Sequence, residues 1–202
     1  MGRKTAIIEA ATRLFAQKGF SETSTAEIAE TASVAHGTLF YHFKNKQGII
    51  QEIFTRAGSV YMTELRKSLA GLETGLQQIK AALRFNEEYS RHHSQQILIF
   101  LRIFPDQLKG GAQSPEREFI DSIQQQVIAI LRESIRAGIA DGTIECRDVE
   151  QTARVLNSLI FGITHMNLLT PAHTPSLTEG AIEFCRRALQ PSARPDPEKQ
   201  KQ

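Results

Sequence analysis

The residues best suited to chemistry in this chain lie near its N-terminus, in the segment HGTLFYHFKNK from His36 to Lys46. Its imidazoles, hydroxyls and phenol can form hydrogen bonds with base edges and phosphates, and its two lysines attract a phosphate backbone electrostatically. The segment is too short to bury all of its rings in a core. We therefore expect part of this ring cluster to lie on the surface, where it binds DNA or a protein or is simply solvated.

Catalytic chemistry has little support elsewhere in the chain. Glu88 and His92 have i, i+4 spacing on a predicted helix and could bind a metal with His93 or Glu87, but no HExxH motif or His/Cys set accompanies them. No GxSxG, P-loop or dinucleotide-binding pattern occurs either. We predict a protein that is not an enzyme and has no metal site and no cofactor; a metal-dependent enzyme is the alternative from another class.

Composition and charge place the chain among ordinary globular proteins. Hydrophobic residues make up 41% and charged residues 23% of its 202 residues. The chain has no run of 18 or more apolar residues that could span a membrane, and its first residues lack the unbroken apolar run of a signal peptide. We therefore expect a cytoplasmic protein. The basic excess of +2 lies within residues 1 to 46, beside the ring cluster, which by itself is weak support for a nucleic-acid partner. Cys146 and Cys185 are far apart without CxxC spacing, which favours two reduced thiols.

The elements that must position the ring cluster are helices. Apolar residues recur at intervals of three and four, and the alternation typical of strands does not appear over a useful length. The first predicted helix ends at Lys18, short helices follow at about 25–32 and from 36, and longer ones run over about 46–69, 74–91, 94–104, 115–137, 148–169 and 176–189. We predict an all-α fold with a disordered tail from residue 191.

Residues 24 to 46 have the outline of a helix-turn-helix motif. The stretch Ser24-Thr25-Ala26-Glu27 is a capping box that begins a short helix, and a tight connection leads to a second helix near His36. The candidates for the core of this unit are Ile28, Ala29, Val34, Leu39 and Phe43. Because Leu39 and Phe43 are four residues apart and face the same way, other rings of the cluster must point outward.

These residues carry a family resemblance. The segment GTLFYHFKNKQGI, with Leu-Phe-Ala-x-x-Gly-Phe in the first helix and S-T-A-E-I-A in the second, resembles the DNA-binding domain of the tetracycline-repressor-like (TetR) transcription factors. The match covers about residues 5 to 50. Beyond it, the resemblance rests on the helix pattern and on the phrases AGIADGTI and IFGIT.

The resemblance implies DNA contacts, carried over position by position. Thr25 would contact a phosphate at the N-terminus of the second helix. The residues that would enter the major groove are His36, Gly37 and Thr38, and those that would hold the backbone are Tyr41, His42, Lys44 and Lys46. Lys46 stands where the family has a lysine that reaches a phosphate.

Three residues depart from the family pattern. Ser33 stands where the family usually has a glycine, and a left-handed conformation would cost a non-glycine residue roughly 1 to 2 kcal/mol there. Ala35 stands where a serine is common, so that the N-cap hydroxyl of the second helix is missing. Phe40 replaces a common tyrosine, which leaves only an apolar contact, for example to a thymine methyl group.

Specific binding by one helix-turn-helix unit usually requires a second copy about one DNA turn away, ~34 Å. The helices at 115–137 and 148–169 are rich in apolar residues, and the second is apolar on several sides. We expect them to form half of an intersubunit four-helix bundle, with Gly162 allowing close approach. The predicted interface residues are Ile123, Val127, Ile130, Leu156, Leu159 and Ile163. The alternative is that both helices only complete the core of one chain.

The resemblance also implies an inducer pocket among the remaining helices. The segment ILIFLRIF, from Ile97 to Phe104, is apolar nearly all round and is therefore internal or lines a pocket. Arg102 within it could anchor a ligand carboxylate, extend to solvent or pair with a glutamate. The candidate ligand-binding residues are Tyr89, His92, Phe100, Arg102 and His165, with Asn86 and His93 as further polar candidates. Such a pocket would suit a small, largely hydrophobic molecule such as a fatty-acyl or aromatic compound.

Together these expectations describe a homodimeric, ligand-responsive DNA-binding regulator, most simply a repressor that a hydrophobic small molecule releases from a palindromic double-stranded operator. Its domains would be a three-helix helix-turn-helix domain at 1–46, a larger helical ligand-binding and dimerisation domain at 47–190, and the tail at 191–202. The alternative within this fold is a DNA-binding regulator without a small-molecule inducer, acting as an activator or under the control of a protein partner.

Overall fold

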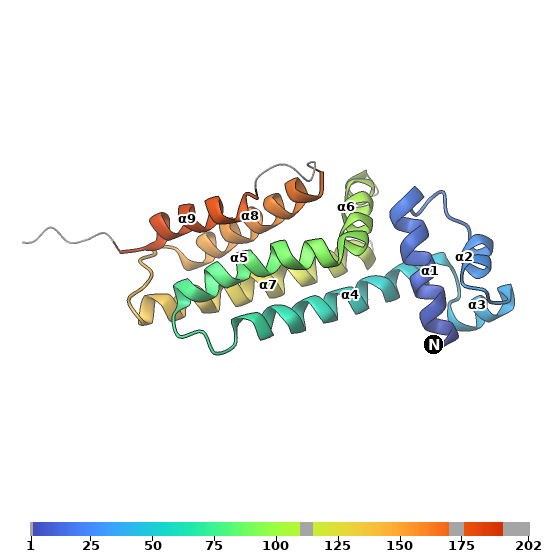
Figure 1. The fold of residues 1–202 in the computed structure, drawn as a ribbon, viewed down its shortest axis with the longest axis horizontal. Helices are drawn as coiled ribbons and strands as arrows, with labels where there is room; N and C mark the ends of the chain where they lie inside the picture. The colour runs from blue at the N-terminus through green and yellow to red at the C-terminus, as the bar shows by residue number, and fades with distance from the viewer. Residues whose placement is uncertain (1, 110–114, 170–175, 192–202) are drawn as a thin grey trace, which may run out of the picture. The chain divides into compact units, whose positions relative to one another are not determined.

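The computed structural model describes residues 2–109, 115–169 and 176–191, apart from the side chains of residues 102–109, 115–116 and 169. Within these ranges the regular structure is entirely helical, which confirms the predicted all-α fold (Figure 1). The helices are α1 (Arg3–Lys18), α2 (Thr25–Thr31), α3 (His36–His42), α4 (Lys46–Leu69), α5 (Gly75–His92), α6 (Ser94–Lys109), α7 (Pro115–Ala140), α8 (Val149–Leu169) and α9 (Thr178–Leu189). None of the described helices combines the length and the hydropathy needed to cross a bilayer. The predicted disordered tail lies outside the described residues from 192 onward.

The chain divides into two compact units. Unit 1 contains residues 1–66 and 88–126, and unit 2 contains residues 67–87 and 127–202. Unit 1 therefore holds α1, α2, α3, most of α4, the end of α5, all of α6 and the first half of α7. Unit 2 holds most of α5, the second half of α7, α8 and α9.

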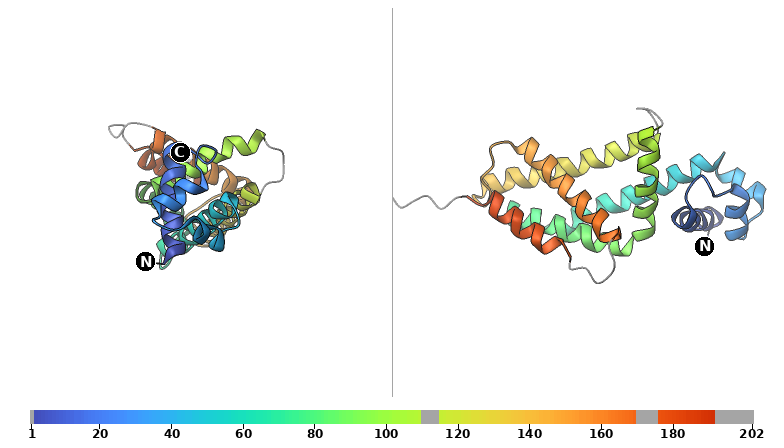
Figure 2. Two further views of the ribbon diagram at one scale, coloured as in Figure 1. Left: turned by 90° about the vertical axis from the view of Figure 1, so that its right-hand side faces the viewer. Right: turned by 90° about the horizontal axis from the view of Figure 1, so that it is seen from above.

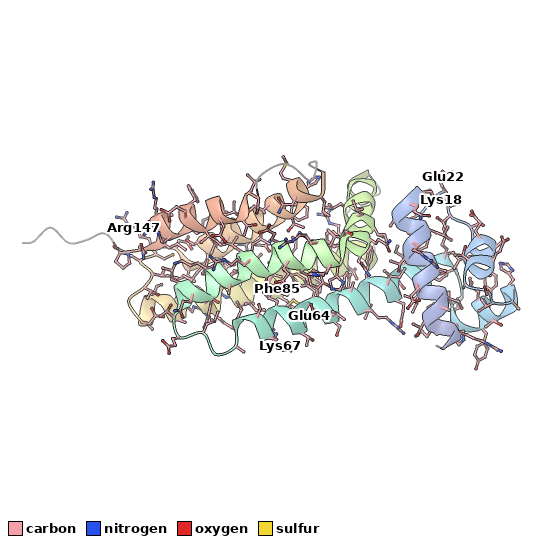
Figure 3. All side chains as sticks on the ribbon, in the orientation of Figure 1. Lys18, Glu22, Glu64, Lys67, Phe85 and Arg147 are labelled. Carbon is pink, nitrogen blue, oxygen red and sulfur yellow. The ribbon has the colours of Figure 1, made fainter. Side chains whose placement is uncertain are left out.

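The first three helices of unit 1 pack around a common apolar core, and their side chains fill the space between them (Figure 3). α1 buries one face at helical spacing and ends at Gly19, whose φ of +91° suits glycine and whose N–H donates to the carbonyl of Phe15 at 3.0 Å. The predicted core residues Ile28, Ala29, Leu39 and Phe43 are buried, and Val34 packs against them. Full burial of a side chain such as Leu39 contributes about 1.5 to 3 kcal/mol.

The same core continues along α4 toward α6 and α7. Phe54 of α4 stacks on Phe119 of α7 with ring centroids 5.8 Å apart, and it meets the edge of Phe100 of α6 at 6.2 Å. Ile99 of α6 is 1% exposed and belongs to the same cluster. The helix-turn-helix motif is therefore held on one continuous core rather than on a core of its own.

The turn between α2 and α3 is a Schellman motif whose left-handed residue is not glycine. Ser33 has a φ of +52°, and its N–H donates to the carbonyl of Glu30 at 2.9 Å. The N–H of Val34 donates to the carbonyl of Ala29 at 2.9 Å. The left-handed conformation considered for Ser33 from the sequence is therefore present. Ala35 precedes α3 without a side-chain cap, as the sequence also indicates.

Unit 2 depends on a close approach of α5 to α7. A Cβ atom at Gly75 would lie 2.1 Å from the backbone nitrogen of Gly138 and 2.2 Å from the carbonyl oxygen of Ser134. The N–H of Gly75 donates to the carboxylate of Asp141 at 2.7 Å, and hydrogen bonds from Thr143 and Gly75 hold the pKa of that carboxyl below its usual value. The sequence predicted that Gly138 lies beyond the helix. This was wrong, because α7 continues to Ala140; a Cβ at Gly138 would lie 2.4 Å from the side chain of Ile144.

Candidate nucleic-acid interface

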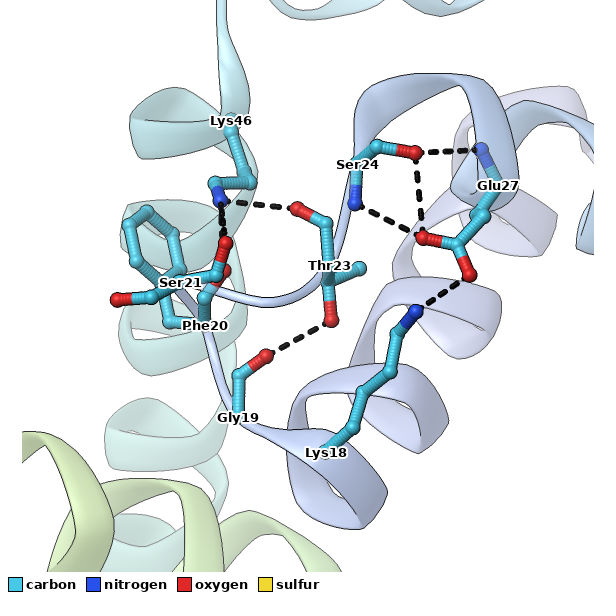
Figure 4. Close-up of polar contacts among 8 residues, drawn as sticks. All are labelled: Lys18, Gly19, Phe20, Ser21, Thr23, Ser24, Glu27 and Lys46. Carbon is cyan, nitrogen blue, oxygen red and sulfur yellow. Dashed lines mark hydrogen bonds and ion pairs between the residues drawn. The ribbon is translucent and has the colours of Figure 1, made fainter.

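Lys46, the first residue of α4, fixes the loop between α1 and α2 (Figure 4). Its ammonium group donates to the carbonyl oxygens of Phe20 at 2.6 Å, Ser21 at 3.3 Å and Thr23 at 2.8 Å. The same group lies 4.4 Å from the centre of the Phe20 ring, which adds a cation–π contact. The three N–H donors of the ammonium group therefore all have carbonyl partners. In this conformation Lys46 does not offer its charge to a phosphate, in contrast to the contact that the family resemblance implies.

The start of α2 has a complete capping box (Figure 4). The hydroxyl of Ser24 accepts a hydrogen bond from the N–H of Glu27 at 3.2 Å, and the Glu27 carboxylate accepts one from the N–H of Ser24 at 3.1 Å. Lys18 at the end of α1 forms an ion pair with the same carboxylate. The hydrogen bond from Lys18, followed by that from the Ser24 backbone, lowers the pKa of Glu27 to about 2. These contacts join α2 to the end of α1 and so orient the motif.

α3 presents most of the ring cluster to solvent. Tyr41 is 85% exposed and Phe40 is 44% exposed, whereas the preceding residue, Leu39, is fully buried in the core. The imidazole of His36 meets the edge of the Phe40 ring at 4.8 Å, and its Nε2 lies 3.3 Å from the hydroxyl oxygen of Thr25 in α2. The first residues of α2 and α3 are thereby brought together, although they are eleven positions apart in the chain.

The structure places the predicted DNA-binding residues as follows. His36, Gly37, Tyr41 and Lys44 are exposed, and Thr25, Thr38, His42 and Lys46 are half-buried. No atom lies within 4 Å of the position that a Cβ would take at Gly37. Nothing in the fold of the chain therefore requires glycine at this position, in contrast to Gly75. Close backbone approach to a partner would explain it.

Residues beside the start of α4 were not predicted from the sequence as part of the DNA-contacting surface. An open groove of about 440 Å³ is lined by Lys4 of α1, by His42 and Lys44, and by Gln47 and Gln51 of α4. Lys4 is held there by an ion pair with Glu52 at 2.9 Å. Polar and basic side chains next to the exposed rings are typical of phosphate-contacting surfaces. No spacing rule in the sequence connects Lys4 with residues some forty positions later.

The predicted ligand-binding residues do not all have the same surroundings. Tyr89 is 7% exposed, and its hydroxyl donates to the carbonyl of Ala57 at 3.4 Å. His92 is exposed, and its Nδ1 lies 2.9 Å from the carbonyl of Glu88, its own helix neighbour. Phe100 is half-buried and packs against the core of unit 1. His165 is half-buried beside Phe161 in unit 2, and the side chain of Arg102 lies outside the described residues.

The predicted dimer residues are mostly internal to the chain. Val127, Ile130, Leu156 and Ile163 are each at most 7% exposed, and Ile123 and Leu159 are half-buried. The large apolar side chains that α8 exposes are Val155 at 53% and Met166 at 50%. A helix that is apolar on several sides does not show in its sequence which side meets the core of its own chain and which side meets a partner, so the interface residues stay a prediction. The exposed face is the one available to a partner.

The described residues contain no group of three or more His, Cys, Asp or Glu side chains placed to hold a metal ion. Within that part of the chain, Glu88 and His92 thus have no third ligand. The thiols of Cys146 and Cys185 are both free, as the spacing predicted. Burial raises the pKa of Cys185.

Comparisons with known proteins agree with this geometry. Residues 7–53 match the model of the bacterial regulatory proteins of the tetR family, and residues 111–190 match the C-terminal domain of AefR-like transcriptional repressors. The HTH-type transcriptional regulator YvkB of Bacillus subtilis, described as uncharacterized, is 30% identical over 159 residues, which cover 77% of this chain and 78% of that protein.

Two solved structures share the fold. FadR from Bacillus subtilis in complex with stearoyl-CoA is 20% identical, with a TM-score of 0.77 over 91% of this chain and 98% of that one. AibR in complex with isovaleryl coenzyme A and operator DNA is 20% identical, with a TM-score of 0.73 over 95% of this chain and all of that one. With the helix-turn-helix geometry and the two family matches, these findings show that the chain belongs to the TetR family of bacterial transcriptional regulators.

Proposed function

We propose that this protein is a homodimeric repressor that binds a palindromic operator through α3 and is released from it by a small, largely hydrophobic molecule. The observation that carries the DNA-binding part is the exposed surface of α3. Tyr41 is 85% exposed there, and Gly37 faces open space although the fold makes no demand for glycine. A helix with this surface fits the major groove, with Thr38 and His36 toward base edges and Tyr41 toward the backbone.

The dimer surface that we propose lies on the exposed faces of α8 and α9. Val155, Leu159, Gly162 and Met166 follow one another at helical spacing along α8; Leu159 is half-buried and the other three are exposed. On α9, Phe184 is 66% exposed. The two helices lie side by side (Figure 2). An apolar face of this kind on a pair of helices is suited to a two-fold four-helix bundle, and a positively charged or bulky residue at Gly162 would prevent it.

The inducer is proposed to be an acyl compound or a molecule of similar polarity. FadR and AibR, which share the fold, were solved in complex with acyl-CoA thioesters. α4 begins beside the DNA-contacting surface and continues for 24 residues, so a ligand that shifts α4 alters the position of α3. Release requires that the ligand prefer the arrangement that does not bind the operator.

The test of this function is fluorescence anisotropy of the full-length protein on a duplex from upstream of its own gene, over a series of salt concentrations. We expect specific binding that weakens steeply with salt and falls at least about tenfold in Tyr41→Ala. The matched control is Arg147→Ala, which removes an exposed side chain of unit 2 (Figure 3). Equal binding by Tyr41→Ala and the wild type would contradict the assignment of α3.

A transcription assay on the same duplex separates the remaining alternatives. A repressor lowers transcription from that promoter when added alone, and an activator raises it. Screening acyl compounds in the anisotropy assay then tests release. Operator binding that no small molecule alters would favour the regulator without an inducer.

A further inference from the structure

Unit 1 contains a second groove, whose lining includes Tyr89 and His93, two of the ligand-binding candidates from the sequence. It has a volume of about 470 Å³ and is lined by residues of α1, α4, the end of α5 and the start of α6. At about 30 Å³ for each water molecule, it has room for roughly fifteen waters and hence for a ligand of about that many heavy atoms. This size is within the usual range of small-molecule sites.

The floor of the groove is apolar and not fully covered. Ile8 of α1 and Ile53 of α4 are buried beneath it, Ala57 is half-buried, and Val60 is 41% exposed. Val60 is one of the few large apolar side chains of unit 1 that are exposed in the described residues. An apolar chain placed along Ile53, Ala57 and Val60 would remove this surface from water, at about 25 cal/mol per Å².

An aromatic pair, Tyr89 and His93, forms part of the lining of the groove. The ring of Tyr89 stacks on the imidazole of His93 with centroids 4.1 Å apart. Burial, with a smaller contribution from the charge of Glu64, raises the pKa of Tyr89 to about 12. The phenol donates to the backbone of α4 at Ala57 and thereby keeps the end of α5 against that helix.

The rim of the groove carries a modest positive charge. The guanidinium of Arg13 in α1 has no ion pair or hydrogen bond with another residue in the described ranges, although Glu9 is one turn away on the same helix. Arg56 of α4 and Lys4 both form ion pairs with the carboxylate of Glu52, so one negative charge is paired with two positive charges. With Glu9 on the same rim, the balance favours a monoanion over a doubly charged phosphate.

We propose that this groove is the effector site, and that it binds a monocarboxylate with an unbranched apolar chain of about ten heavy atoms. The carboxylate pairs with Arg13, whose planar guanidinium offers two parallel donors. The chain lies along Ala57 and Val60 toward Tyr89. This inference rests on the proposed function for its regulatory meaning, because it identifies the chemistry of the ligand to which the repressor responds.

The position of the groove explains how occupancy would be coupled to DNA. Ile8 of α1 lines the groove and also belongs to the core that carries α2 and α3, and α1 also packs against α6. A ligand that touches α1, α4 and α6 at once binds best to one spacing of these helices. It therefore biases the position of the DNA-contacting helices, and operator binding must bias the ligand affinity by the same factor.

The test is isothermal titration calorimetry of the full-length protein with sodium decanoate, with decan-1-ol as the uncharged comparison. We expect decanoate to bind better than decan-1-ol, and its affinity to fall about tenfold or more in Arg13→Met, which removes a charged hydrogen-bonding partner. Ala57→Phe should lower the affinity similarly, because it fills the floor. The matched control is Arg91→Met, which removes an exposed arginine that does not line the groove.

The second measurement is operator anisotropy with and without decanoate. Decanoate should weaken operator binding by the wild type and have little effect on Arg13→Met. Absence of decanoate binding, or binding that neither groove variant changes, would overturn the proposed site. Binding that leaves operator affinity unaltered would overturn its role as effector site. In both cases, operator binding that still depends on Tyr41 would leave the proposed DNA-binding function standing.

Discussion

Replacing Lys46 with methionine separates a structural lysine from a DNA-contacting one. The side chain of Lys46 donates to three carbonyl oxygens of the loop between α1 and α2, at 2.6 to 3.3 Å. Methionine keeps an unbranched apolar stem that can still pack on Phe20, but it has no charge and no donor. Lys44, two positions earlier, is exposed and provides the matched lysine-to-methionine control.

The magnitude follows from the three hydrogen bonds. A hydrogen bond from a charged donor contributes about 1.5 to 3 kcal/mol. The contributions are not additive here, because the carbonyl of Ser21 is exposed and those of Phe20 and Thr23 are only partly buried, so that water can replace much of what is lost. We expect Lys46→Met to lower the free energy of unfolding by about 2 to 3 kcal/mol, which lowers Tm by about 5 to 10 °C in a chain of this size.

The assay combines thermal unfolding with the salt dependence of operator binding. Lys44→Met should leave Tm nearly unchanged, because it is a surface substitution without a partner to lose. If Lys44 neutralises one phosphate, the slope of log K against log salt becomes shallower by about 0.9. Lys46→Met should show the reverse pattern, with a lower Tm and an unaltered slope.

The reasoning would be refuted by one clear result. Suppose that Lys46→Met keeps the Tm of the wild type and that its slope of log K against log salt is shallower by about 0.9. Lys46 then leaves the loop carbonyls and contacts a phosphate when DNA binds. The contacts in Figure 4 would then be a resting position of the side chain. The contact implied by family resemblance would be correct after all.

Three further substitutions test other features. Ser33→Gly removes the strain of a left-handed conformation at φ +52°, which destabilises the folded state by roughly 1 to 2 kcal/mol. Glycine also stabilises the unfolded state through its greater entropy, by roughly 0.5 to 1 kcal/mol. We expect a slightly higher denaturation midpoint, and a lower midpoint would contradict this account of the turn. Gly75→Ala places a Cβ 2.1 Å from the backbone of Gly138, and we expect unfolding to become easier by about 3 kcal/mol or more, measured as Tm. Lys18 lowers the pKa of Glu27 to about 2, so the contribution of this carboxylate to the stability of the fold is complete above its ordinary pKa of 4.5 and is lost as the pH falls toward 2. Glu27→Gln should therefore flatten the dependence of stability on pH between 4.5 and 2. An unchanged acid profile would count against the ion pair.

The local signals in the sequence were sufficient for much of the motif. A capping box needs only residues three apart, so Ser24 and Glu27 could be paired without coordinates. The same holds for the inward direction of Leu39 and Phe43, because helical periodicity fixes which residues share a face. The strain at Ser33 was also visible, since the family pattern places glycine there and the physical reason for glycine is the sign of φ.

Tertiary structure alone decided which residues meet across long separations. The partners of Lys46 lie 23 to 26 positions earlier, and the groove at α1 is built from helices that no periodicity connects. Gly138 was predicted to follow the end of its helix, whereas α7 continues to Ala140 and leaves room at Gly138 only for the side chain of Ile144. On α8, several apolar stripes were equally good candidates for the core, and only the packing of one chain showed which remained exposed. Sequence patterns specify the faces of each helix, whereas the choice among faces depends on the free energy of packing all the helices together.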